Sequence, residues 1–166
     1  MKQLTGSHFE TPLGVMIAVT DELFLYLLEF ENRKNLNKEI LKLNAEIISG
    51  ETAVSKLTER QLTEYFAGER QKFHLPLQLT GTTFQQKVWQ EVTKVRFGTK
   101  VSYKMIAERI GQPSASMAVG AANGANQFAI VVPCHRLVRA DGGLAGYAAG
   151  LDKKKALLEF ENAHKH

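Results

Sequence analysis

The single cysteine of this 166-residue chain lies between a proline and two side chains that can carry positive charge. Pro133 precedes Cys134, and His135 and Arg136 follow it. A thiolate is a strong, soft nucleophile, and nearby positive charge favours the thiolate over the thiol. Cys134 is therefore a candidate nucleophile, with a buried, inert cysteine as the open alternative.

The residues around Cys134 predict how it is presented. The flanking segments 130–132 and 137–138 are apolar and rich in β-branched residues, which favours a buried strand, and Pro133 is expected to bend it. Neighbouring side chains on a strand point to opposite faces. His135 can thus reach the sulfur only if the chain turns, or indirectly through a water molecule.

Three short helices are predicted upstream of the cysteine. A threonine cap leads into residues 84–95, Ser102 can cap residues 103–110, and Ser114 can cap residues 115–123. Short helices joined by tight turns are the layout of a helix-turn-helix unit. The third helix consists almost wholly of small residues, which allow close approach to another surface, either nucleic acid or a neighbouring helix.

The first half of the chain predicts a small α+β unit with no cluster of chemically active residues. Alternating and periodic apolar positions predict two strands joined at Asp21-Glu22, two helices and a further short strand. Their ranges are 15–20 and 23–30 for the first strands, 35–48 and 55–67 for the helices, and 73–79 for the last strand. The expected domains are residues 1–79 and 80–166.

Composition excludes several classes of protein. Hydrophobic residues make up 44% and charged residues 23% of the chain, as in folded soluble domains. The apolar runs are too short to cross a bilayer, and the first residues lack the apolar segment of a signal peptide, so a cytoplasmic protein without membrane contact is expected. One cysteine allows neither an internal disulfide nor a multi-cysteine zinc site.

Charge is distributed unevenly between the two halves. Residues 1–79 carry nine Lys/Arg and eleven Asp/Glu, a net charge of −2, whereas residues 80–166 carry twelve and six, a net charge of +6. A basic half attracts polyanions such as a nucleic-acid backbone. A solvated surface with uneven charge is the simpler alternative.

Five segments in order resemble the methylated-DNA–protein-cysteine methyltransferases, the O6-alkylguanine-DNA alkyltransferase family. They are the segments at 81–90, 101–103, 118–126, 131–138 and 146–151, and they cover most of residues 80–161. The resemblance implies a ribonuclease-H-like amino-terminal α/β domain followed by a winged-helix or helix-turn-helix alkyltransferase domain, an α+β protein overall. It also implies stoichiometric, irreversible transfer of an alkyl group from O6-alkylguanine to Cys134, without cofactor or metal, by a monomer.

The resemblance assigns roles to further residues. His135 is implied to act as a base that relays the thiol proton through water to Glu161, with Glu159 as a rival carboxylate. Tyr103 is implied to donate a proton to the departing purine, and Asn126 to tie the helix-turn-helix to the segment that carries Cys134. The pocket for the flipped base is implied to include Tyr147, Ala148 and main-chain carbonyls near Leu137. Many members of the family have serine at the position of Ala148.

The implied partner is double-stranded DNA that contains alkylated guanine, with O4-alkylthymine as a further candidate. The small-residue helix is expected to enter the minor groove through Ala118, Ala121 and Ala122, and the target base must be flipped out of the duplex. Met117 stands where many members carry the arginine that fills the vacated space, so flipping or DNA affinity is expected to be weaker. Candidate phosphate contacts are Lys104, Arg109, Arg136 and Arg139.

Two other classes of function remain open. A non-catalytic lesion-binding protein would lack the nucleophile, so Cys134 argues against that class. A cysteine hydrolase would need an oriented third group and an oxyanion hole. The sequence has no separate signature for either feature, and adjacent Cys and His are not the usual arrangement in such enzymes.

Overall fold

Within residues 2–165, which the computed structural model describes, the chain divides into two units, Met1–Leu79 and Thr80–His166. No helix in the described range is long and apolar enough to cross a membrane. The architecture is mixed α/β.

The first unit is a four-stranded sheet with two helices. Its elements are β1 (Lys2–Thr11), β2 (Gly14–Thr20), β3 (Leu25–Phe30), α1 (Leu36–Leu41), β4 (Ala45–Ser49) and α2 (Ala53–Phe66). The strand order is β3-β2-β1-β4, with β4 parallel to β1 and the other pairs antiparallel. The predicted turn at Asp21-Glu22 does join β2 to β3.

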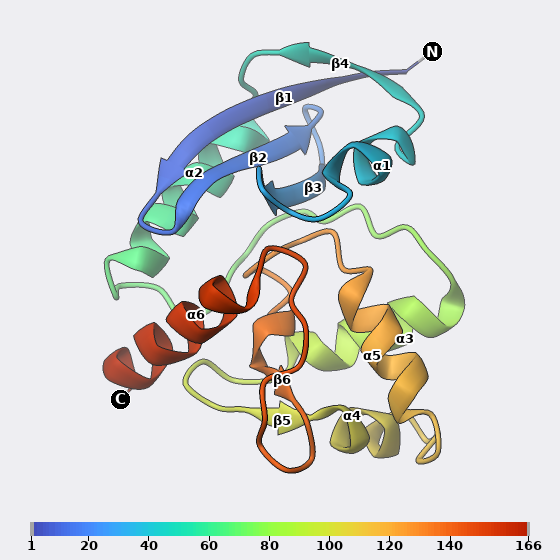
Figure 1. Cartoon of the computed structure of the whole chain (residues 1–166). Helices are drawn as coiled ribbons and strands as arrows, with labels where there is room; N and C mark the ends of the chain where they lie inside the picture. Colours follow the sequence, from blue (N-terminus) through green and yellow to red (C-terminus); the bar gives the residue numbers. More distant parts are fainter. Residues whose placement is uncertain (1, 166) are drawn as a thin grey trace. The chain divides into compact units, whose positions relative to one another are not determined.

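Alternation along β2 distributes its side chains to the two faces of the sheet. Ile17 and Val19 belong to an apolar cluster against which Leu36 and Ile40 of the α1 region pack. On the opposite face, the Thr20 hydroxyl lies 2.7 Å from the hydroxyl of Thr52, which caps α2. Figure 1 shows α2 lying behind β1 and β2.

Two predictions for this unit need correction. The helix predicted over 35–48 ends at Leu41, because Asn44 adopts a positive φ of 49° and residues 45–49 form β4 instead. Pairing with β1 satisfies the backbone of β4, and its alternate residues Ala45 and Ile47 still pack on the apolar cluster. The strand predicted over 73–79 is reduced to one bridge, between Leu25 and Leu77.

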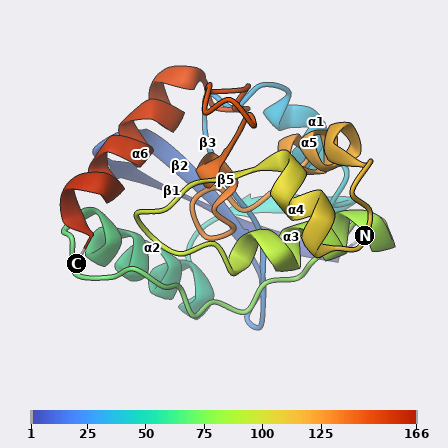
Figure 2. The ribbon, with the colours of Figure 1, turned by 90° about the horizontal axis from the view of Figure 1, so that it is seen from below.

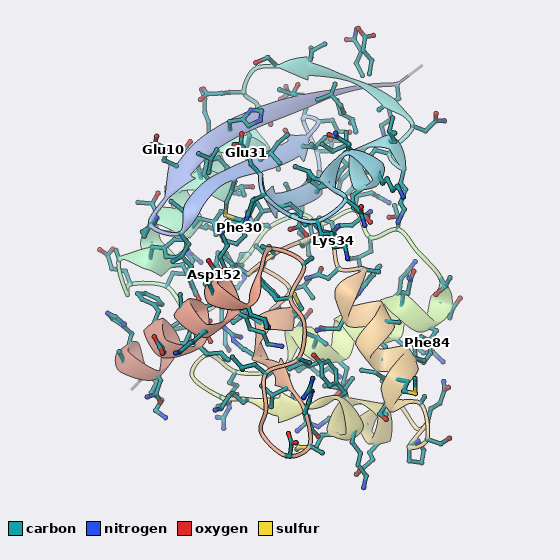
Figure 3. The ribbon with its side chains drawn as sticks, in the orientation of Figure 1. Glu10, Phe30, Glu31, Lys34, Phe84 and Asp152 are labelled. Atoms are coloured by element: carbon teal, nitrogen blue, oxygen red, sulfur yellow. The ribbon has the colours of Figure 1, made fainter. Side chains whose placement is uncertain are left out.

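The second unit is mainly helical. Its elements are α3 (Thr83–Thr93), β5 (Val101–Ser102), α4 (Tyr103–Arg109), α5 (Ser116–Gly124), the 3₁₀ turn η1 (Cys134–Arg136), β6 (Leu137–Val138) and α6 (Leu151–His164). Figure 2 shows α3, α4 and α5 gathered together, with β5 beside α4. Figure 3 labels Phe84 at the start of α3 and Asp152 at the start of α6.

Local sequence explains where these helices begin. Thr82 and Gln85 form a reciprocal capping box at α3, and the Ser102 hydroxyl accepts a hydrogen bond from the Met105 amide at α4. The three predicted helices are present, but α5 begins one residue later than Ser114 would place it, after Ala115 and without a side-chain cap. The Trp89 indole anchors α5 to α3 by donating to the Ala122 carbonyl at 2.8 Å.

The segment before Cys134 is buried, as predicted, but it is not a strand. Residues 129–132 form turns, and Ile130 has a positive φ of 71°. Short-range bonds such as Val132 N–H to the Phe128 carbonyl replace the expected sheet pairing. Two-residue strands β5 and β6 pair in parallel, Val101 opposite Leu137, which brings the start of α4 beside the turn that carries Cys134.

Candidate active site

Cys134 is the first residue of the 3₁₀ turn η1 and is only 7% exposed. The Asn126 side-chain amide lies 3.1 Å from Sγ and also donates to the Val132 carbonyl at 3.0 Å. Asn126 Oδ1 accepts from the Phe128 backbone at 3.0 Å. One side chain therefore fixes the turn before the cysteine and directs an N–H group at the sulfur.

His135 is fully buried, and its Nε2 lies 2.8 Å from Oε2 of Glu161. Burial lowers the pKa of His135 below its ordinary 6.5, against the opposing attraction of Glu161, so the imidazole is neutral at pH 7. A carboxylate only accepts hydrogen bonds, so Nε2 carries the proton and Nδ1 carries the lone pair. Within residues 2–165, the buried Nδ1 has no hydrogen-bond partner.

Glu161 lies in the last turn of α6 and is 1% exposed. Burial raises the pKa of this carboxyl, but hydrogen bonds from His135 and Arg136 outweigh burial and hold the pKa well below its usual range. The rival Glu159 is exposed and lies 4.0 Å from Lys155. The carboxylate next to His135 is therefore Glu161.

Arg136 occupies a different position from the one expected of a phosphate contact. Its guanidinium is buried and binds both oxygens of Glu161, Nε to Oε1 at 2.8 Å and Nη2 to Oε2 at 2.9 Å. Nη1 donates to the Val95 carbonyl at 2.7 Å. The expectation that Arg136 contacts DNA is corrected, because its donors are committed to holding the Glu161 carboxylate.

Tyr103, the first residue of α4, lies close enough to Cys134 for a charge on the sulfur to affect its hydroxyl. Burial and the negative charge of Cys134 raise the pKa of Tyr103, while Arg139 and a hydrogen bond with Asn123 oppose the rise. The phenol therefore keeps its proton at neutral pH. Asn123 also donates from Nδ2 to the Cys134 carbonyl at 3.2 Å, which links α5 to the cysteine turn.

The small-residue helix α5 has one exposed face. Met117 is 90% exposed, and Ala118 and Ala121 are also exposed. Ala122 is 2% exposed, and its carbonyl accepts from Trp89. The expectation that Ala122 contacts DNA is corrected, because it packs against α3.

The loop between β6 and α6 carries Tyr147 and Ala148, both half-buried. Its turns are closed by backbone bonds, including Gly150 N–H to the Tyr147 carbonyl at 2.9 Å. Leu137 is fully buried and lies in β6 directly after the cysteine turn. The Lys154 ammonium connects this loop to the helix that bears Glu161 by donating to the Ala145 carbonyl at 3.3 Å.

Sequence reasoning missed Asn123 and Lys154. The signal for Lys154 was present, because Lys154, Leu157 and Glu161 are spaced three and four residues apart and so share one face of α6. All three are buried. Asn123 had a weaker signal, as a polar side chain that ends a run of small residues.

Comparisons with known proteins point to one family. The profile described as 6-O-methylguanine DNA methyltransferase, DNA binding domain, matches residues 83–163. Methylated-DNA–protein-cysteine methyltransferase of Mycobacterium tuberculosis is 50% identical over 103 residues, which is 62% of this chain and 62% of that protein. The protein of the same name from Methanosarcina acetivorans is 39% identical over 155 residues, which is 93% of this chain and 96% of that protein.

A solved structure is similar over nearly the whole length. The crystal structure of Mycobacterium tuberculosis OGT in complex with DNA has a TM-score of 0.86 and 36% identity, and the match covers 96% of this chain and 94% of that one. The match with the Methanosarcina protein, over 155 of 166 residues, extends through both units. The chain belongs to the methylated-DNA–protein-cysteine methyltransferase family.

Proposed function

We propose that this protein repairs DNA by moving the alkyl group of O6-alkylguanine onto its own Cys134. The sulfur forms a bond to the alkyl carbon, the bond between that carbon and O6 breaks, and the electron pair of that bond passes to the purine. The purine takes up one proton and the cysteine has lost one, so the products are guanine and S-alkylcysteine. A thioether is a poor leaving group, so each molecule acts once.

The buried chain of groups behind the sulfur supports this reaction. Neutral His135 has its lone pair on Nδ1 and its proton on Nε2, held by Glu161 at 2.8 Å. It can therefore accept the thiol proton, through a bridging water, while Glu161 stabilises the resulting imidazolium. The amide of Asn126, 3.1 Å from Sγ, donates to the developing thiolate.

The purine needs a proton as it departs. Tyr103 retains its phenolic proton at neutral pH and lies near the sulfur, so it is the proposed donor. General acid catalysis of this kind contributes about 10²–10⁴-fold. Tyr147, Ala148 and main-chain groups near Leu137 are proposed to form the pocket wall, where the Ala148 backbone amide donates to O6 in place of the serine of many relatives.

The proposed partner is double-stranded DNA that carries alkylguanine, with O4-alkylthymine as a further candidate substrate. The exposed face of α5, with Ala118 and Ala121, enters the minor groove, and Met117 occupies the space of the flipped base. We also infer that the second unit is a winged-helix-like alkyltransferase domain and that the first is a ribonuclease-H-like domain. The four-stranded mixed sheet with a helix against each face supports the latter.

One observation carries the proposal. The single cysteine, Cys134, is followed by the buried His135, whose Nδ1 has the lone pair and no hydrogen-bond partner among residues 2–165. Intact-protein mass spectrometry after incubation with a duplex containing O6-methylguanine tests it. One added methyl group is expected, mapped by peptide analysis to Cys134, with none in Cys134→Ser. An unmodified protein in the presence of excess damaged duplex would refute the transfer, and an O4-methylthymine duplex run in parallel tests the second substrate.

A further inference from the structure

Lys154 is a fully buried lysine on α6. A buried ammonium is costly unless it is paired, and such residues usually have a carboxylate partner. Among the described residues, no acidic side chain lies within ion-pair distance of its Nζ. Its polar contact is the Ala145 carbonyl at 3.3 Å, a neutral group.

The groups that face Lys154 come from two other elements. Its Nζ lies 5.9 Å from the centre of the Tyr103 ring on α4. Cys134 and His135 on η1 both interact with its charge. Glu161, on the same helix, is occupied by His135 and Arg136. Of the groups near Lys154, the Cys134 sulfur is the one that must become an anion before the alkyl group can move, because the Tyr103 phenol keeps its proton until the purine departs.

We propose that Lys154 is the electrostatic positioning residue of the active site, whose ammonium is the counter-ion of the Cys134 thiolate. Its charge has two effects that act together. It stabilises the anionic sulfur, and it disfavours a second positive charge on His135, which keeps the imidazole neutral and able to accept the thiol proton. The bond to Ala145 holds the same ammonium against the loop that carries Tyr147.

The interaction is reciprocal, as any coupling between two titrating groups must be. Burial lowers the pKa of Lys154, and the charge of Cys134 opposes that change. The lysine must in turn favour the thiolate by the same free energy. The counter-ion role of Lys154 rests on the proposed function only for its biological purpose. The effect of Lys154 on the pKa of Cys134 can be measured without DNA.

The first experiment measures the pKa of the Cys134 thiol from the thiolate absorbance near 240 nm as a function of pH. The absorbance of a Cys134→Ser variant of the same protein is subtracted at each pH. In Lys154→Met, the apparent pKa of Cys134 is expected to rise by at least about one unit, the lower end of the effect of an adjacent opposite charge. Lys154→Arg, which keeps the charge, is expected to restore most of the shift. Lys155→Met is the matched control, an exposed lysine on the same helix, and should leave the titration unchanged.

Transfer from methylated duplex then follows the same pattern. The rate of Lys154→Met at pH 7 is expected to fall about tenfold and to recover at alkaline pH, where the thiolate forms without assistance. A merely structural role would lower the rate equally at every pH. An unchanged thiol titration in a folded Lys154→Met protein would overturn the proposal.

A second measurement covers the case in which Lys154→Met does not fold. The Lys154 side-chain resonances are titrated by NMR in the unmodified protein and in Cys134→Ser, where no thiolate can form. The pKa of Lys154 is expected to be lower in Cys134→Ser, and equal values would reject the coupling. Failure of methyl transfer in the unmodified protein would refute the proposed function but would leave both thiol and lysine titrations interpretable.

Discussion

At the scale of single residues, Glu161 joins the two residues that follow Cys134 in the sequence. It accepts from His135 and from two nitrogens of Arg136, all in the interior. The carboxylate therefore has two roles, which are to fix the tautomer of the base and to neutralise a buried guanidinium. The corrected position of Arg136 follows from the second role.

Replacing Glu161 with Gln should impair both activity and stability. The loss of a carboxylate behind His135 is expected to slow methyl transfer at least about a hundredfold. The uncompensated Arg136 should lower the free energy of unfolding at pH 7 by about 3–5 kcal/mol. Single-turnover kinetics and urea unfolding measure these effects, and exposed Glu159→Gln is the matched control. If Glu161→Gln and Glu159→Gln had the same free energy of unfolding, a structural role of the Glu161–Arg136 ion pair would be contradicted.

The same residue makes stability depend on pH. The pKa values of His135 and Glu161 are both lower in the folded protein than their ordinary 6.5 and 4.5. As the pH falls, these two groups are therefore protonated in the unfolded chain at a higher pH than in the folded protein, and this favours unfolding. Their contribution to stability is complete above about pH 6.5 and decreases as pH falls, first through His135 and then, below about 4.5, through Glu161. In Glu161→Gln the decrease below pH 4.5 should be smaller.

At the scale of elements, α5 connects the surface to the turn that carries Cys134. Its exposed face carries Met117, while its buried end carries Asn123, which holds the Cys134 carbonyl and interacts with Tyr103. The indole of Trp89 fixes the helix from the other side. A displacement of α5 on DNA would therefore reach the cysteine turn through Asn123.

Met117→Arg tests the part of α5 that departs from the pattern of many relatives. A methionine can fill an apolar gap but cannot hydrogen-bond an orphaned cytosine. The arginine variant is expected to repair methylated duplex about tenfold faster, a gain of about 1.4 kcal/mol against the few kcal/mol that base flipping costs. Transfer from a methylated single strand should be unchanged. An equal or slower rate on duplex would count against a role for Met117 in flipping.

At the scale of the whole molecule, charge separates the two halves of the chain. Residues 80–166 have a net charge of +6 and residues 1–79 a net charge of −2. Binding to a duplex should therefore depend on salt through the second unit. The exposed Lys104 and Arg109 of α4 are the proposed phosphate contacts, along with Arg139.

The salt dependence of binding provides the test. Replacing Lys104 and Arg109 together with Gln should weaken binding to undamaged duplex and reduce the slope of log K against log salt by about 1.8, since each neutralised phosphate contributes about 0.9. Lys72→Gln, an exposed change in the acidic half, is the control. Fluorescence anisotropy between 50 and 200 mM salt measures the slopes, and an unchanged slope in the double variant would exclude these contacts.

Some features of this protein could be predicted from the sequence because they depend on local chemistry. Thr82 and Ser102 begin helices by bonding free backbone amides within three residues, so α3 and α4 were predicted near their observed starts. The Pro-Cys-His-Arg segment indicated a candidate nucleophile, because only a few residue types can perform that chemistry. The carboxylate partner of His135 came from the family resemblance.

The tertiary structure decided what depends on long-range partners. Residues 45–49 have an apolar stripe that fits either a helix or a strand, and the free edge of β1 selected the strand. Arg136 and Lys154 look like surface cations in sequence. Both are buried in the folded chain, where Glu161 pairs with the Arg136 guanidinium and the Ala145 carbonyl accepts a hydrogen bond from Lys154. The sequence determines which charged residues the chain has. Only the folded structure determines which of them are buried away from water.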